Sequence, residues 1–131
     1  MQRFTISIDD AMAAAFDELI ARRGYVNRSE AFRDLIRKEI GAKNLDDPDG
    51  RCVAVVSYLF DHHKLDLSNR MTDKQHEHTG LVISSLHVHV NADDCVEAVV
   101  MRGPTAKVRA LAEATIAERG IENGAVNLIA L

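Results

Sequence analysis

Two histidines and a cysteine lie close together in one short segment of this 131-residue chain, which reads LHVHVNADDCV. Because strand side chains alternate between faces, His87 and His89 project from one side while Val88 and Val90 point toward a core. A tight turn that pairs His89 with Cys95 brings the thiol to the same side as the imidazoles. Imidazole and thiolate ligands suit Ni, Cu or Zn, so the segment predicts a transition-metal site.

A fourth ligand is available upstream of this hairpin. His76 precedes the first hairpin strand by about one helical turn and is a plausible ligand. Three imidazoles and one thiolate can surround Zn in a tetrahedron or Ni(II) and Cu(II) in a square plane, so spacing does not choose the metal. The second cysteine, Cys52, stands in an apolar run without a nearby histidine and is interpreted as core packing.

Other polar residues near the hairpin have two interpretations each. Glu97 follows Cys95 by two residues, so we expect its carboxylate on the ligand face, accepting a hydrogen bond from a ligand N–H such as that of His76. The alternative is an ordinary exposed acid. His62, His63 and His78 could form a secondary metal site, but the favoured interpretation is polar loop.

Composition and charge limit the classes of protein. A hydrophobic content of 47%, with neither an 18-residue apolar run nor a signal-peptide pattern, indicates one ordinary domain or two small ones in the cytoplasm, away from the membrane. The net charge of -4 argues at first against nucleic acid. However, the segment from Arg22 to Lys38 carries six basic residues against two acids, a local basic excess.

The first forty residues predict one strand and two helices. Residues 2–8 alternate apolar and polar side chains, as a half-buried strand does. Asp9 and Asp10 suit a helix start and Gly24 its end, and a capping-box spacing over 27–30 begins a second helix that is expected to end at Gly41. So few elements cannot bury a core alone. Two chains that pair their strands into an antiparallel ribbon remove this difficulty.

The N-terminal pattern, with RFTISID at 3–9 and RRGYVNRSEA at 22–31, resembles the ribbon-helix-helix repressors, which read the major groove with strands. With the His-Cys hairpin downstream, the whole chain resembles the nickel-responsive ribbon-helix-helix repressor family, NikR. The resemblance implies one Ni(II) per subunit, held by His87, His89 and Cys95 of one subunit and His76 of a neighbour in a homotetramer.

The same resemblance implies that Arg3, Thr5 and Ser7 face bases of an operator, although the family ordinarily has Thr where this chain has Ser7. Arginine can donate two hydrogen bonds to guanine, and hydroxyls can donate and accept at base edges. Free amides near Arg28 and Ser29, at the start of the second helix, suit a DNA phosphate.

A further cation could bind near the second helix. Glu30 and Asp34 match positions where the family places a cation between its two modules. The favoured alternative is a capping glutamate and a solvated aspartate.

The rest of the chain predicts a second domain. A charged, turn-rich linker over 46–50 separates residues 1–45 from 51–131. Beyond it we expect strands over 51–60, 81–90, 95–102 and 125–131, and helices over 65–76 and from Pro104 to about Gly120. This βαββαβ order is the ferredoxin-like split unit, so the fold class is α+β, and the family's metal domain is of the ACT type.

The function implied by the resemblance is a nickel-responsive regulator that binds operator DNA when Ni(II) is bound and represses nickel uptake genes. A sensor of Zn, Cu or Co with the same architecture is the first alternative. An antitoxin, which also uses a ribbon-helix-helix module, is the second. An enzyme is not expected, because four protein ligands leave no open metal position for a substrate.

Overall fold

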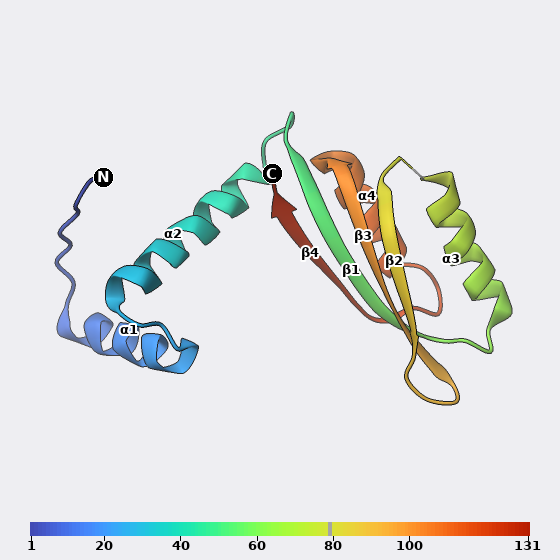
Figure 1. Cartoon of the computed structure of the whole chain (residues 1–131), viewed down its shortest axis with the longest axis horizontal. Helices are drawn as coiled ribbons and strands as arrows, with labels where there is room; N and C mark the ends of the chain where they lie inside the picture. The colour runs from blue at the N-terminus through green and yellow to red at the C-terminus, as the bar shows by residue number, and fades with distance from the viewer. Residues whose placement is uncertain (79) are drawn as a thin grey trace. The chain divides into compact units, whose positions relative to one another are not determined.

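The computed structural model describes the backbone of residues 1–78 and 80–131, and the side chains of these residues except those at 65 and 68. The chain divides into two compact units, residues 1–40 and 41–131 (Figure 1). Among the helices of this described part, none is long and apolar enough to cross a bilayer.

Two helices make up most of the N-terminal unit. Helix α1 spans Asp10–Arg23, begins where Asp9 Oδ1 accepts a hydrogen bond from Met12 N at 2.8 Å, and ends at Gly24 with φ of 70°. Both ends are as predicted, because the aspartate satisfies a free amide and glycine tolerates the left-handed conformation.

Helix α2 spans Arg28–Asn44 and begins with reciprocal caps. Asn27 Oδ1 accepts from Glu30 N at 2.8 Å, and Glu30 Oε2 accepts from Val26 N at 3.0 Å. The predicted end at Gly41 is wrong. Gly41 does not have a positive φ and continues the helix for another turn, since the residues after it are compatible with helix.

The predicted strand over residues 2–8 does not form in the single chain. Residues 1–9 carry no strand, and Phe4, Ile6 and Ile8 of the predicted buried face are exposed, Phe4 to 77%. A lone strand leaves its backbone N–H and C=O groups without partners, so the alternating pattern has nothing to pair with here.

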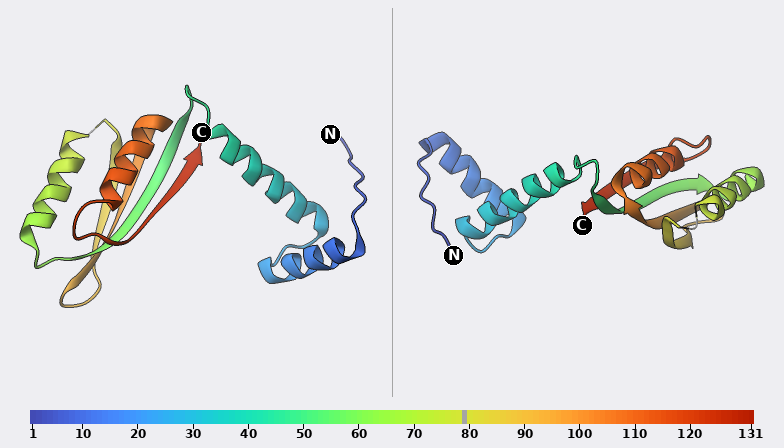
Figure 2. Two further views of the ribbon diagram at one scale, coloured as in Figure 1. Left: turned by 180° about the vertical axis from the view of Figure 1, so that it is seen from behind. Right: turned by 90° about the horizontal axis from the view of Figure 1, so that it is seen from above.

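The C-terminal unit is a four-stranded sheet covered by two helices (Figures 1 and 2). In chain order its elements are β1 (Arg51–Asp61), α3 (Leu65–Glu77), β2 (Val82–His89), β3 (Asp94–Pro104), α4 (Thr105–Ile116) and β4 (Glu122–Ala130). The strand order is β2-β3-β1-β4 and every pair is antiparallel. The predicted βαββαβ order is therefore confirmed.

The core of this unit lies between one face of the sheet and the two helices. Alternate residues of β1 and β3 point into it, and Cys52 is fully buried there, as predicted. In the left view of Figure 2, α4 lies in front of the strands. The buried cluster consists of Cys52, Ala54, Val56, Tyr58, Phe60, Leu67, Met71, Cys95, Val99, Met101, Val108, Leu111 and Ala112.

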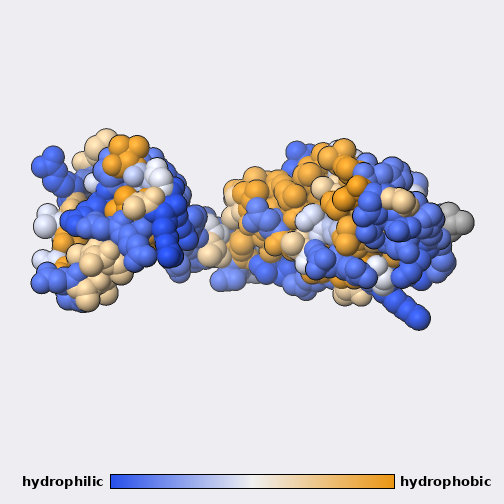
Figure 3. Space-filling view, turned by 90° about the horizontal axis from the view of Figure 1, so that it is seen from below, coloured by the Kyte–Doolittle hydropathy of each residue, from blue (hydrophilic) through white to orange (hydrophobic). Residues whose placement is uncertain are grey.

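The opposite face of the sheet is open and apolar. Val88 and Val90 were expected in a core but are 44% and 57% exposed, with Leu86 beside them. The helices cover only the face toward which His87 and His89 project, so the intervening valines reach solvent in the single chain. Figure 3 shows apolar side chains gathered over part of the surface of this unit.

Candidate metal centre and nucleic-acid interface

The β2–β3 hairpin brings His89 and Cys95 together. The two residues are direct partners in the antiparallel register, as predicted, and the Cys95 Sγ and His89 Nδ1 atoms lie 3.2 Å apart. Asn91 Oδ1 accepts from Asp93 N and Asp94 N at 2.8 Å each and so closes the turn. Local sequence alone is therefore sufficient to bring these two ligand types together.

His62, interpreted from the sequence as polar loop, joins this pair. Strand β1 pairs Phe60 with Cys95, and just beyond its end His62 N donates to Asp93 O at 3.0 Å. One ligand atom from each of His62, His89 and Cys95 lies within 4.8 Å of the others. The signal that could have found His62 is the long-range pairing of β1 with β3, which spacing within one hairpin does not contain.

His87 lies next to this cluster, on the same face of β2. Its ring centroid is 5.1 Å from that of His89 and 5.6 Å from that of Phe60. Its Nδ1 atom is 3.8 Å from Glu97 Oε2, because His87 and Glu97 are direct partners across β2 and β3. The His87 side chain is thus two residues from the His89–Cys95 pair along the same strand face, and it lies opposite the Glu97 carboxylate.

Glu97 is a buried acid, 8% exposed, rather than an ordinary surface residue. Its Oε1 atom accepts from Gln75 Nε2 at 2.7 Å, so its partners within the single chain are Gln75 and His87. A hydrogen bond from His76 stays a prediction. Burial first, and then the Glu97 charge, raises the pKa of the neighbouring Tyr58 hydroxyl, which stays protonated. Glu97 therefore connects α3 to the strand that carries His87.

His76 lies on α3 with an exposed side chain and is not among the residues that converge. Ion pairs hold α3 to the segment after α4, because Lys74 Nζ and Arg70 Nε lie 2.8 and 3.3 Å from carboxylate oxygens of Glu118. The His76 side chain is thus exposed and does not join the ligand atoms that its own hairpin brings together. His78, just past the end of α3, is also exposed.

The electrostatic surroundings of Cys95 favour a cation. Burial raises the pKa of the Cys95 thiol above its ordinary value, and the negative charges of Asp94, Asp61 and Glu97 raise it further. A positive ion beside the sulfur would oppose these same charges and stabilise the thiolate, which is the form that binds metal.

The donor set and spacing fit a transition-metal ion. Nitrogen and sulfur atoms bound at about 2.0–2.3 Å to one ion lie roughly 3–4 Å from one another. The 3.2 Å between Cys95 Sγ and His89 Nδ1 falls in this range. His63 has other partners, because its Nε2 atom lies 3.1 Å from Ala92 O and 3.2 Å from Asp93 Oδ1.

The predicted DNA-contacting residues lie on the surface of the N-terminal unit. Arg3, Thr5, Ser7 and Ser29 are all exposed. Arg28 is exposed but engaged, since its Nε and Nη2 atoms donate to the two carboxylate oxygens of Asp17 at 2.8 and 2.7 Å. This contact holds the pKa of the Asp17 carboxyl below its ordinary value.

Glu30 and Asp34, proposed from the sequence as a cation site, have protein partners within their own unit. Glu30 caps α2, as its alternative interpretation held. Asp34 accepts a hydrogen bond from the Tyr25 hydroxyl and pairs with Lys38 Nζ at 3.1 Å, so it is more than a solvated acid. A cation at these residues stays a prediction.

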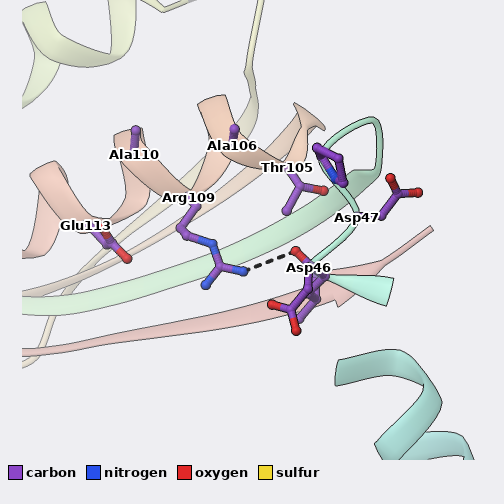
Figure 4. A pocket seen from close by; sticks show the side chains of 9 residues that line it. Asp46, Asp47, Thr105, Ala106, Arg109, Ala110 and Glu113 are labelled. Carbon is purple, nitrogen blue, oxygen red and sulfur yellow. Dashed lines mark hydrogen bonds between the residues drawn. The ribbon is translucent and has the colours of Figure 1, made fainter. Parts of the chain in front are cut away.

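One further hollow lies beside α4, between that helix and the turn that precedes β1 (Figure 4). Its volume is about 420 Å³, and Arg109 Nη2 donates across it to Leu45 O at 3.4 Å. Its lining contains acids but neither histidine nor cysteine, so it does not have the donor set of the hairpin.

Comparison with known families matches both units. Residues 53–129 match the family described as NikR C terminal nickel binding domain, and residues 2–43 match the family described as ribbon-helix-helix protein, copG family. A ribbon-helix-helix domain, which binds DNA and dimerises, joined to a nickel-binding domain is the make-up of a metal-responsive transcription regulator. The chain belongs to the NikR family.

Proposed function

We propose that this protein is a nickel-responsive repressor that binds operator DNA when Ni(II) is bound and thereby represses nickel uptake genes. The observation that carries the proposal is the convergence of His89 and Cys95, with His87 next on the same strand face, inside a domain of a nickel-binding family. Nickel is preferred over Zn, Cu or Co because of this family, since the ligand types alone suit all four metals.

The proposed site holds one Ni(II) per subunit with His87, His89 and Cys95 of one subunit and His76 of a neighbour. The outward position of His76 supports a ligand supplied across an interface. Glu97, 3.8 Å from His87 Nδ1, is proposed to orient that imidazole. Bound nickel supplies the cross-subunit link, and its preference for one arrangement of the subunits shifts the equilibrium toward the DNA-binding form.

The proposed assembly is a homotetramer made of two DNA-binding dimers. In the N-terminal unit the exposed Phe4, Ile6 and Ile8 support pairing of two N-terminal segments into a ribbon. In the C-terminal unit the open apolar face with Leu86 and Val88 supports sheet packing between subunits of an ACT-type domain. Each surface exposes several large apolar side chains, as surfaces between subunits do before assembly.

The proposed DNA contacts divide into two kinds. Arg3, Thr5 and Ser7 on the paired ribbon read base edges in the major groove, and Arg28 with the amides near Ser29 holds phosphates. The charges and hydroxyls of these exposed residues support the assignment. Phosphate contacts set the register, while the ribbon residues set the sequence preference.

A nickel titration of DNA binding tests the proposal. An operator is first selected from random duplexes with the nickel-loaded full chain, and its affinity is then measured with and without nickel at fixed salt. We expect at least a tenfold gain with nickel, and loss of this gain in His76→Ala but not in His78→Ala, a matched exposed histidine. Cys95→Ala should also lose the Ni(II)–thiolate charge-transfer absorption, whereas Cys52→Ala should keep it. An affinity that does not respond to nickel would refute the proposal.

A further inference from the structure

Asn123 is the one asparagine in the sequence that is followed by a glycine. The side-chain carbonyl carbon of an asparagine can be attacked by the backbone nitrogen of the next residue. A glycine at that next position leaves the nitrogen without a neighbouring side chain that would hinder the attack. Asn123 and Gly124 belong to β4, and both are exposed. The pair is therefore accessible to water, which the later step of such a reaction consumes.

The two residues form a bulge near the start of β4. The register between β1 and β4 shifts at this point, so Asn123 and Gly124 together lie opposite the single residue Tyr58. Strand β4 is also at the edge of the described sheet, where Figure 1 shows it in red. A bulge interrupts the ladder of hydrogen bonds and leaves its extra residue unpaired. The peptide between Asn123 and Gly124 therefore has more freedom to turn than the peptides of the regular ladder.

Backbone geometry and packing explain why these residue types stand here. Asn123 has a φ of 51°, and no other described residue except glycine has a positive φ. Asparagine is among the side chains that best tolerate this left-handed region. A Cβ atom on Gly124 would lie 2.7 Å from the Cβ atom of Ile116 and 2.9 Å from its Cγ2 atom, so glycine allows β4 to pass the end of α4. The fold thus favours both residues of the reactive pair.

Two other asparagines differ from Asn123 in the features that matter. Asn91 Oδ1 accepts two backbone hydrogen bonds at 2.8 Å each, which hold its side chain in place. Asn127 is exposed and lies in the same strand, but it pairs in register with Val55 and is followed by Leu128. Both residues are therefore internal controls for the effect of the bulge and of the glycine.

We propose that Asn123 is a site of spontaneous covalent modification, at which the folded chain deamidates to aspartate and isoaspartate. Gly124 N attacks Asn123 Cγ, and the bond between Cγ and the side-chain nitrogen breaks. The side-chain nitrogen leaves as ammonia, taking the proton of the Gly124 amide, and a five-membered cyclic imide remains. One water then opens the ring at either of its carbonyls, adding a hydroxyl to carbon and a proton to nitrogen.

The two ways of opening the ring give different products. One restores the normal main chain with an aspartate, and the other gives isoaspartate, in which the main chain runs through the former side chain. The overall reaction consumes one water and releases one ammonia, without an oxidant or a cofactor. Each product carries one additional negative charge at neutral pH. The reaction does not depend on nickel or on DNA, so this proposal goes beyond the proposed function.

Site-resolved mass spectrometry of the folded full-length chain tests the proposal. The protein is incubated in mildly alkaline buffer, because the attacking nitrogen must lose its proton, and aspartate and isoaspartate are quantified at each asparagine. We expect conversion at Asn123 to be at least tenfold faster than at Asn127 or Asn91. Isoaspartate should be present among the products, because only the cyclic imide gives it. The rate should rise with hydroxide concentration.

One variant and a matched control separate this site from the rest of the chain. Asn123→Gly suits the left-handed φ and removes the reactive amide, so the more acidic form that ion-exchange chromatography separates should no longer accumulate. Asn127→Ser, a change in the same strand, should accumulate this form as the original chain does. Urea unfolding curves check that both variants fold.

Three results would overturn the inference. The first is an equal rate at Asn123 and Asn127, and the second is an acidic form that accumulates unchanged in Asn123→Gly. The third is conversion at Asn123 only after the chain is unfolded in urea, which would mean that the native bulge protects the pair. None of these measurements involves nickel or DNA, so a failure here is distinguishable from a failure of the repressor proposal.

Discussion

The two units of the chain bury their apolar residues in opposite ways. In the N-terminal unit Ala31 is the buried hydrophobic residue of the helices, while Phe4, Ile6 and Ile36 remain exposed. The C-terminal unit closes a core between its sheet and helices within one chain, to which thirteen of its described residues belong. The first unit thus encodes only half of a core, as expected of a domain that dimerises, while the second encodes a complete core plus an extra apolar face.

The largest expected effect is on the incomplete unit. Ile6→Asp places a charge on the apolar side of the proposed ribbon, where its desolvation would oppose dimer formation. We expect operator affinity to fall more than a hundredfold while nickel absorption stays unchanged, because the metal centre belongs to the other unit. Ala14→Asp, on an exposed position of α1, is the control and should bind DNA as the original chain does. A ribbon variant that still binds DNA would remove the need for a second copy.

Truncating one apolar side chain in each unit compares how much burial stabilises the two units. Met101→Ala empties a position that is 1% exposed in the C-terminal core, so we expect the unfolding free energy to fall by about 2–5 kcal/mol in urea. Ile36→Ala is the matched change in the N-terminal unit. If a second chain covers Ile36, its loss reaches a similar size and depends on concentration. A loss below about 0.5 kcal/mol would instead mean a solvated position.

The smallest effect concerns the ion pairs that hold α3. Lys74 first, and then Arg70, holds the pKa of the Glu118 carboxyl below its ordinary value of 4.5, although partial burial opposes this. Because the folded pKa is lowered, Glu118 stabilises the fold above pH 4.5, and this contribution is lost as the pH falls through the lowered value.

Glu118→Gln should therefore reduce unfolding free energy by about 0.5–1 kcal/mol at pH 7, the size of a partly exposed pair, and by nothing once the pH lies below the lowered pKa. Urea unfolding of the original chain and the variant, at pH 7 and at a pH below the lowered pKa, measures this difference in unfolding free energy. Glu113→Gln, an exposed acid on α4, should show no such pH dependence. Equal losses at both pH values would show that Glu118 acts by packing rather than by charge.

Sequence reasoning was sufficient where the determinants are local. The caps of α1, the pairing of His89 with Cys95 and the βαββαβ order follow from turn residues and alternation over short stretches. It placed the end of α2 too early because glycine permits a helix end but does not require one. It gave residues 2–8 a strand that the single chain lacks, since strand formation needs a partner.

Reasoning from the sequence missed His62 because its approach depends on contacts between distant segments. The β1–β3 ladder pairs Asp61 with Asp94. His62, the residue after Asp61, therefore lies at the hairpin turn, although the two segments are about thirty positions apart in the chain. Alternation along either strand contains no information about that register. The exposure of Val88 and Val90 has a related origin, because a strand pattern predicts two faces but not which one the helices of the same chain cover.

The pair between Arg28 and Asp17 has a consequence for the energetics of operator recognition. Two of the five guanidinium N–H donors already bind a carboxylate, so three donors remain for the proposed phosphate contact. A phosphate that took the Nε and Nη2 edge instead would have to displace Asp17, whose carboxylate would then be rehydrated. An intramolecular anion therefore competes with the nucleic acid for this edge of Arg28 before any dissolved salt does.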